Sequence, residues 1–269
     1  MKKLLFKIRD LLASVIECIL RPILHKYLYE INRLNQENIS TAIMHQKSFP
    51  QFKNINAGKD VVIVACGPTA ADYTPIPNAV HIGVNRAFKL TNIKLNYLFI
   101  HDTGKNMEML GELPTTEQYP CTRFYGTSNE PDAETITFPE SHTIKDKSFR
   151  YRTDRIDWTG VCNSAFRYDI STQPLADFGS VVFPALQFAL WTNPCRIFLV
   201  GCDCSLNGHF HADTVKQWLP LDQMIFGYNE FKRHARKFYP TTKIISVNPV
   251  GLKGMFQDWN QKDGEPMPK

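Results

Sequence analysis

The stretch VVIVACG, residues 61–67, is a run of β-branched residues that ends in a cysteine and a glycine, with Pro68 next. A short apolar run bounded by turn residues is typical of a strand buried on both faces of a parallel sheet. Further strand candidates are residues 81–84, 97–102, 123–126, 197–203 and 243–249, and helical patterns occupy about 180–191 and 229–239. This alternation predicts an α/β fold: a Rossmann-like, mostly parallel sheet with helices on both faces.

The chain of 269 residues is long enough for one large domain with an appendage. We expect residues 1–57 to form N-terminal amphipathic helices, interrupted at Pro22, followed by a polar connector from residue 35. Residues 58–269 are expected to form the Rossmann-like domain. Within it, about 108–175 is rich in Thr, Pro, Asp and Arg without periodicity, which predicts an irregular lid insertion.

The first 34 residues place lysines and arginines beside an apolar face. Such a basic amphipathic segment suits a membrane interface, and it suits equally well packing on its own domain or on a second subunit. No uninterrupted run reaches the ~20 apolar residues that a membrane span requires. The start also lacks the pattern of a secretory signal.

Composition narrows the function classes. The formal net charge of +5 favours anionic substrates or an anionic membrane surface. No dense basic block interleaved with aromatic residues is present, which speaks against a nucleic-acid-binding protein. The 7 cysteines are odd in number and scattered, so we expect reduced thiols in the cytoplasm rather than a disulfide framework.

The strand ends carry the polar residues. In an open parallel sheet, ligands bind beyond the carboxyl ends of the strands, near the point where the strand order reverses. The segments at these ends are 66–73, 84–88, 101–105, 201–211 and 247–254. In the first, Gly67 permits close backbone approach, and the amides after it can meet a phosphate or ribose oxygen. A single glycine excludes both a Walker loop and a full dinucleotide fingerprint.

The segment 201–211 holds the candidate catalytic residues. Asp203 follows the strand directly and can accept hydrogen bonds from ribose or sugar hydroxyls, while an Asn-Gly turn at 207–208 would return His209 and His211 over the same place. Only one residue separates Cys202 from Cys204, and no second pair follows at a suitable spacing, so we expect no metal site.

Taken in order, these loops resemble a known family. The motifs are G-P-T at 67–69, N-R-A-F at 85–88, Gly179-Ser180 before an apolar helix, G-x-D-x-x-x-N-G at 201–208 and N-P at 248–249. This arrangement resembles the bacterial sialyltransferases of glycosyltransferase family 42. It is also similar to the related Rossmann-like group of flagellin-modifying glycosyltransferases and archaeal pterin diphosphokinases. The resemblance covers roughly residues 60–105 and 178–254.

The resemblance implies a CMP-sugar donor, with no metal and no further cofactor. It implies that Gly67, Pro68 and Thr69 border the nucleotide, that Asn85 and Asp102 lie near the sugar or phosphate, and that Ser180, Gly201 and Asp203 line the cytidine and ribose. Ser205 and His211 stand where the family has two tyrosines that bond the donor phosphate.

One departure concerns the general base. The family has a histidine before the helix that precedes the last strand, but residues 217–231 contain none, and Asp222 and Tyr228 are the only candidates there. Transfer with inversion needs a base for the acceptor proton and help for the leaving phosphate. We therefore assign the base to His209 and the phosphate contact to His211. Phosphate clamps from the lid are the further candidates Arg150, Arg152 and Arg155.

The sequence thus predicts an inverting, sialyltransferase-like glycosyltransferase that passes an acidic sugar from a CMP-sugar to a bacterial glycan or glycolipid acceptor, in lipopolysaccharide or capsule synthesis. It would be cytoplasmic, and peripheral on the inner membrane if residues 1–34 dock there. Two alternatives stay open: a Mg²⁺-dependent pterin or nucleotide diphosphokinase using Asp102 and Asp203, and a non-catalytic assembly partner. Self-association, the sugar, the acceptor and the linkage are left open.

Overall fold

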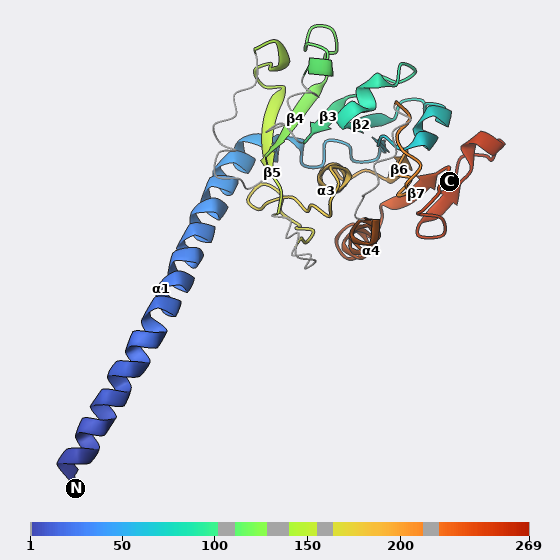
Figure 1. Cartoon of the computed structure of the whole chain (residues 1–269). Coiled ribbons are helices and arrows are strands. Elements are labelled where there is room, and N and C mark those ends of the chain that lie inside the picture. Colours follow the sequence, from blue (N-terminus) through green and yellow to red (C-terminus); the bar gives the residue numbers. More distant parts are fainter. Residues whose placement is uncertain (1, 102–110, 128–139, 155–163, 212–220, 269) are drawn as a thin grey trace. The chain divides into compact units, whose positions relative to one another are not determined.

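The structure, a computed structural model, describes residues 2–101, 111–127, 140–154, 164–211 and 221–268. It consists of two compact units, Met1–Ser40 and Thr41–Lys269. The first unit is helical throughout its described part. Helix α1 (Lys2–Ser48) begins in the first unit and ends in the second, and it continues without a break through Pro22, where an interruption was expected (Figure 1).

The second unit is built on one sheet of eight parallel strands (Figure 1). The strands are β1 (Asp60–Val64), β2 (Val80–Val84), β3 (Tyr97–Ile100), β4 (Thr122–Thr127), β5 (Ser148–Arg152), β6 (Arg196–Val200), β7 (Lys243–Val247) and β8 (Gln257–Trp259). Their order is β5-β4-β3-β2-β1-β6-β7-β8. The chain therefore runs outward from β1 to one edge, crosses to the other side of β1, and runs outward again. The order reverses between β1 and β6, and the predicted α/β fold is confirmed.

Alternate strand residues face opposite layers, as the two-residue period of a strand requires. Ile63 of β1 and Leu199 of β6 face helices α3 (Val182–Trp191) and α4 (Leu221–Phe238). Val62 and Phe198 face the other layer, where the 3₁₀ helices η2 (Pro68–Asp72) and η3 (Asn85–Lys89) contribute core residues. Every residue of α3 is buried. Over the described residues, the further 3₁₀ helices are η1 (Pro50–Phe52), η5 (Glu140–His142) and η6 (Gln261–Asp263).

The segment 108–175, expected as an irregular lid, contributes β4 and β5 to the sheet. β4 matches the strand expected at 123–126, whereas β5 and β8 were not expected. In β5, Phe149 and Tyr151 pack against the core while arginines alternate with them. The strand was missed because two arginines in five residues weaken the apolar signal, and a partner strand already in place decides the conformation.

The polar connector expected from residue 35 is also different in the structure. α1 extends to Ser48, and Phe49 and Phe52 are buried in the core. His45 explains part of this anchoring, because its ring bonds the backbone of β5 and of the loop before α3. The composition of this stretch is polar, but its few apolar and aromatic side chains fill the space beside β4.

Candidate functional site

The loops after β1 and β6 meet at the reversal point of the sheet. Val64 pairs with Val200, so the two strands end side by side. Beyond them, the Gly67 amide donates to the Gly201 carbonyl at 2.8 Å. A Cβ on Gly67 would stand 2.5 Å from that carbonyl oxygen and 2.5 Å from Asp203 Oδ2, so only glycine fits. This is the place where parallel sheets of this kind bind ligands.

Asp203 joins the two loops. Its side chain is buried, with 5% of the residue exposed, and its Oδ2 accepts from the Thr69 amide at 2.9 Å. The Thr69 hydroxyl donates to Oδ1. Burial raises the pKa of Asp203, and the two bonds from Thr69 oppose that shift.

This tie bears on two expectations, both of which stay predictions. Asp203 was expected to accept from ribose or sugar hydroxyls, and the amide of Thr69 was expected near a phosphate. In the structure each satisfies the other, because neighbouring strands bring the carboxylate within reach of the amide before any ligand is present. Asp203 therefore positions the first loop, which begins with Pro68 at the first position of η2.

The loop after β6 is shaped by Gly201, whose φ of +63° lies in the left-handed region that favours glycine. A Cβ there would lie 2.7 Å from the Ala65 carbonyl oxygen. Farther along, the carbonyl of Asp203 accepts from the Gly251 amide at 2.8 Å, which brings in the loop after β7. Ser205 accepts the Asn207 amide at 3.4 Å and so holds the turn that follows.

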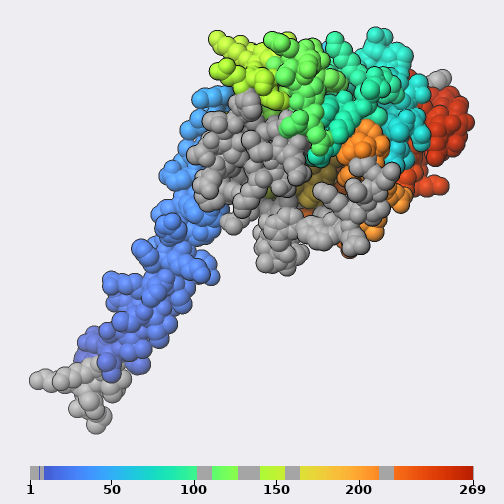
Figure 2. Space-filling view, turned by 45° about the horizontal axis from the view of Figure 1, so that its top comes forward, coloured from blue at the N-terminus to red at the C-terminus, as the bar shows by residue number. Residues whose placement is uncertain are grey.

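The expected return of the histidines is confirmed by one backbone bond. The Phe210 amide donates to the Cys66 carbonyl at 3.0 Å, directly after β1. The Phe210 side chain packs against the core. His209 and His211, on either side of it, stack their rings with centroids 5.3 Å apart and an interplanar angle of 15°. In Figure 2 the orange surface after β6 lies against the cyan surface of the segments after β1 and β2.

Two cations that the sequence analysis did not single out lie near this pair. The pKa of His211 is lowered by burial first, and then by the charges of His209, Lys89 and Arg86. Arg86 bonds Glu112 through Nε at 3.0 Å and Nη2 at 2.9 Å, and Lys89 Nζ lies 2.6 Å from the same carboxylate. These bonds hold the pKa of Glu112 at about 2.

A sequence signal for these cations existed. Arg86 stands inside the N-R-A-F motif, and a 3₁₀ turn brings the residue three positions later to the same side. What the sequence did not reveal is that the charges of η3 act on the returning histidine segment. The charges of Arg86, Lys89 and Glu112 therefore act on the imidazole of His211, which stacks on His209.

Asn85 also lies at this edge, with a φ of +45°. Its Oδ1 accepts from the His101 amide at 3.1 Å, so it joins the ends of β2 and β3. The side-chain oxygen of Asn85, a residue expected near the sugar or phosphate, thus holds the backbone of the next strand end. Asp102, expected next to it, lies outside the described residues.

Ser180 stands before α3, at the same edge of the sheet. α3 ends at Trp191, and β6 begins a few residues later, so the end of the helix lies near the amino ends of the strands. The Trp191 carbonyl accepts from the Asn54 amide, in the segment that leads to β1. A helix of ten residues is about 15 Å long, so its start lies toward the carboxyl ends of the strands. The Ser180 hydroxyl accepts the Val182 amide at 3.3 Å.

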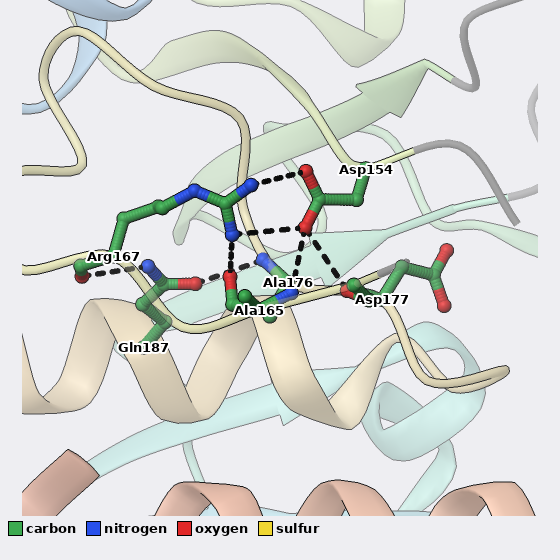
Figure 3. A network of polar contacts seen from close by, with 7 residues as sticks. Asp154, Ala165, Arg167, Ala176, Asp177 and Gln187 are labelled. Atoms are coloured by element: carbon green, nitrogen blue, oxygen red, sulfur yellow. Dashed lines mark hydrogen bonds and ion pairs between the residues drawn. The ribbon is translucent and has the colours of Figure 1, made fainter. Parts of the chain in front are cut away.

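The approach to α3 is held by the polar network in Figure 3. Arg167 bonds both carboxylate oxygens of Asp154 at 3.0 and 3.2 Å. Ser164 donates to Asp154 at 3.1 Å and accepts the Asp177 amide at 2.6 Å. Gln187 of α3 accepts the Ala176 amide and donates to the Arg167 carbonyl, each at 2.8 Å. The network fixes the loop that leads into Ser180.

The expected lid clamps are placed differently. Arg150 and Arg152 belong to β5, four strand spacings from β1, which is roughly 19 Å. Arg152 is 5% exposed, so it belongs to the interior of the domain and does not reach the reversal point. Arg155 lies outside the described residues.

Of the two substitutes for the family's histidine, Tyr228 is buried beside Cys202, and burial raises its pKa well above the usual range. It is protonated at neutral pH and unsuited as a base. Asp222 lies in the first turn of α4 and is exposed.

Two searches covered only the described parts of the chain. Among these residues, no three His, Cys, Asp or Glu side chains gather as a metal-binding group. Over the same parts, no helix combines the length and apolar character needed to cross a bilayer.

The comparison with solved structures gives a distant likeness. No protein-family model matches the chain, and no curated protein matches it. A solved structure, the MAf glycosyltransferase from Magnetospirillum magneticum AMB-1, shares 14% sequence identity with a TM-score of 0.47, over 85% of this chain and 40% of that one. The chain thus spans less than half the length of that protein, and no residue role is taken from the likeness.

Proposed function

We propose that this protein is an inverting glycosyltransferase that moves an acidic sugar from a CMP-sugar to a hydroxyl of a bacterial surface glycan, lipopolysaccharide or capsule. One observation carries the proposal. A stacked pair of histidines lies on the segment that returns to the end of β1, at the reversal point of a parallel sheet, and the charges of Arg86 and Lys89 act on His211. The loops carry motifs in the order seen in the family 42 sialyltransferases. The reaction proposed needs no metal.

At the anomeric carbon, the proposed step forms one bond and breaks one. The acceptor oxygen attacks the anomeric carbon, and the bond from that carbon to the CMP phosphate oxygen breaks, with its electron pair leaving on CMP. The acceptor proton passes to a histidine, which we take to be His209. The developing charge on the phosphate needs hydrogen-bond donors and cations.

His211, Arg86 and Lys89 support the second requirement. The lowered pKa of His211 keeps its ring neutral near pH 7, and a neutral imidazole still has one N–H to donate. The charge then comes from Arg86 and Lys89, which already bind a carboxylate in this structure. We propose that the donor phosphate competes with Glu112 for these cations.

Nucleotide binding is the first test. Thermal shift with CMP, CDP, UMP, GMP and AMP should show stabilisation by cytidine nucleotides above the others. Arg86→Gln should weaken that stabilisation, whereas Arg233→Gln, which changes an exposed arginine paired with Glu230 on α4, should not. Stabilisation by another nucleotide alone would refute the CMP donor, and stabilisation by none would refute nucleotide-sugar transfer.

The diphosphokinase alternative is separated by its metal. It would place Mg²⁺ on Asp102 and Asp203, but both oxygens of Asp203 accept from Thr69. Transfer activity that survives EDTA would support the glycosyltransferase, and a strict requirement for Mg²⁺ would favour the kinase.

A further inference from the structure

The unit Met1–Ser40 carries a broad uncovered apolar surface. Between residues 11 and 28 of α1, ten large apolar side chains are each 46% to 67% exposed. They are Leu11, Leu12, Val15, Ile16, Ile19, Leu20, Ile23, Leu24, Tyr27 and Leu28. At about 100° per residue they cover more than half of the helix circumference. An isolated helix of this kind gains stability only when the apolar arc is covered.

Charge along α1 is divided unevenly. Residues 2–28 contain six Lys or Arg and two Asp or Glu, a net charge of +4, whereas residues 29–48 are neutral overall. In the neutral part, Arg33 bonds both Glu30 and Glu37, so these charged side chains are paired with one another within the helix. The basic part coincides with the uncovered apolar arc.

The wide apolar arc and the net positive charge argue against a second copy of this chain as the partner that covers the arc. A two-stranded coiled coil uses a narrow apolar seam flanked by opposite charges. The arc here is too wide for such a seam, and parallel pairing would bring together two segments that each carry a net charge of +4. An anionic surface matches both the width and the sign.

We propose that residues 2–28 of α1 lie on the surface of an anionic phospholipid membrane, with the apolar arc toward the acyl chains and the lysines and arginines at the headgroups. The inference does not depend on the proposed glycosyl transfer. It concerns the first unit alone and assigns no orientation to the second.

Vesicle flotation of the full-length chain tests it. The protein should float with vesicles of phosphatidylcholine and phosphatidylglycerol in equal parts, and not with phosphatidylcholine alone. Binding should weaken as salt is raised, because the Debye length falls from about 10 Å at 0.1 M to about 3 Å at 1 M.

Two sets of variants separate the charge from the apolar arc. The charge set changes Lys2, Lys3, Lys7 and Arg9 to Gln, and its control changes the exposed Lys59, Lys94, Lys145 and Lys253 to Gln. Each charge lost from α1 should weaken binding about fivefold. The apolar set changes Leu12, Ile16 and Ile19 to Gln, with Ser14→Gln on the opposite side as its control. The three changes of the apolar set together should abolish flotation, and Ser14→Gln should leave it unchanged.

Three results would overturn the proposal: no flotation with anionic vesicles, equal flotation with both vesicle types, or equal losses in the charge set and its control. If the wild-type protein does not bind vesicles but forms a salt-resistant oligomer, and the apolar set dissociates that oligomer, the arc is covered by a second copy instead. Thermal shift with CMP on the same variants reports the second unit, so failure of membrane binding and failure of nucleotide binding are distinguishable.

Discussion

His45, in the last turns of α1, should make this protein lose stability in acid. The ring is fully buried. Its Nδ1 lies 2.9 Å from the Ile170 carbonyl oxygen, and its Nε2 lies 2.8 Å from the Arg152 amide nitrogen. Since an amide can only donate, Nε2 must be unprotonated and Nδ1 must carry the hydrogen. A second proton would break the bond to Arg152 and place a charge in the core.

The magnitude follows from the pKa. Burial lowers the pKa of His45 from 6.5 to about 4 in the folded protein. The unfolded chain therefore takes up the proton first, so the contribution to stability is complete above pH 6.5 and is lost as the pH falls toward 4. Each pKa unit corresponds to about 1.4 kcal/mol, which makes the loss roughly 3 kcal/mol.

Urea unfolding between about pH 7.5 and pH 4 measures this loss. His45→Gln removes the titrating group, and the drop in unfolding free energy over this range should shrink by roughly 3 kcal/mol relative to the wild type. His234, whose pKa is also lowered by burial to about 4, contributes equally in both proteins. His25→Gln, on an exposed position of α1, is the matched control.

An unchanged pH dependence in His45→Gln would refute the reasoning. If that variant does not fold, NMR titration of the His45 ring in the wild-type protein decides the same question. A ring that takes up its proton near pH 6.5 would show that burial does not control it.

Further predictions concern the loops that follow the carboxyl ends of the strands. Gly67→Ala forces a Cβ against the Gly201 carbonyl and Asp203, and should lower the unfolding free energy by about 1–3 kcal/mol in urea, with loss of any nucleotide-induced thermal shift. Asn85→Ala leaves the His101 amide without its acceptor, which should cost about 1–2 kcal/mol in the same assay. Glu112→Gln removes the carboxylate that neutralises Arg86 and Lys89, so calorimetry should show CMP binding tightened by about threefold to tenfold. His209→Asn should lower kcat of sugar transfer by about a hundredfold or more with little change in KM, whereas His211→Asn should raise the KM for the donor; the reverse pattern would exchange their proposed roles.

The sequence by itself determined where the central strands lie and where along the chain the polar loops follow them. The stretches 61–67 and 197–203 each begin with a short apolar run and end in turn residues, a pattern typical of buried strands. These signals are local, because side-chain hydrophobicity and turn preference act within a few residues. The return of His209 and His211 was predictable for the same reason, since an Asn-Gly turn reverses the chain.

Only the tertiary structure decided which polar groups remain for a ligand. Thr69 and Asp203 are 134 residues apart, and they bond because the sheet places β6 next to β1. Arg86 and Lys89 join the histidines because η3 follows β2 at the same edge. β5 and the anchoring by His45 likewise depend on partners far along the chain. Strand order is a property of the whole packed sheet, so no local pattern encodes which loop ends become neighbours.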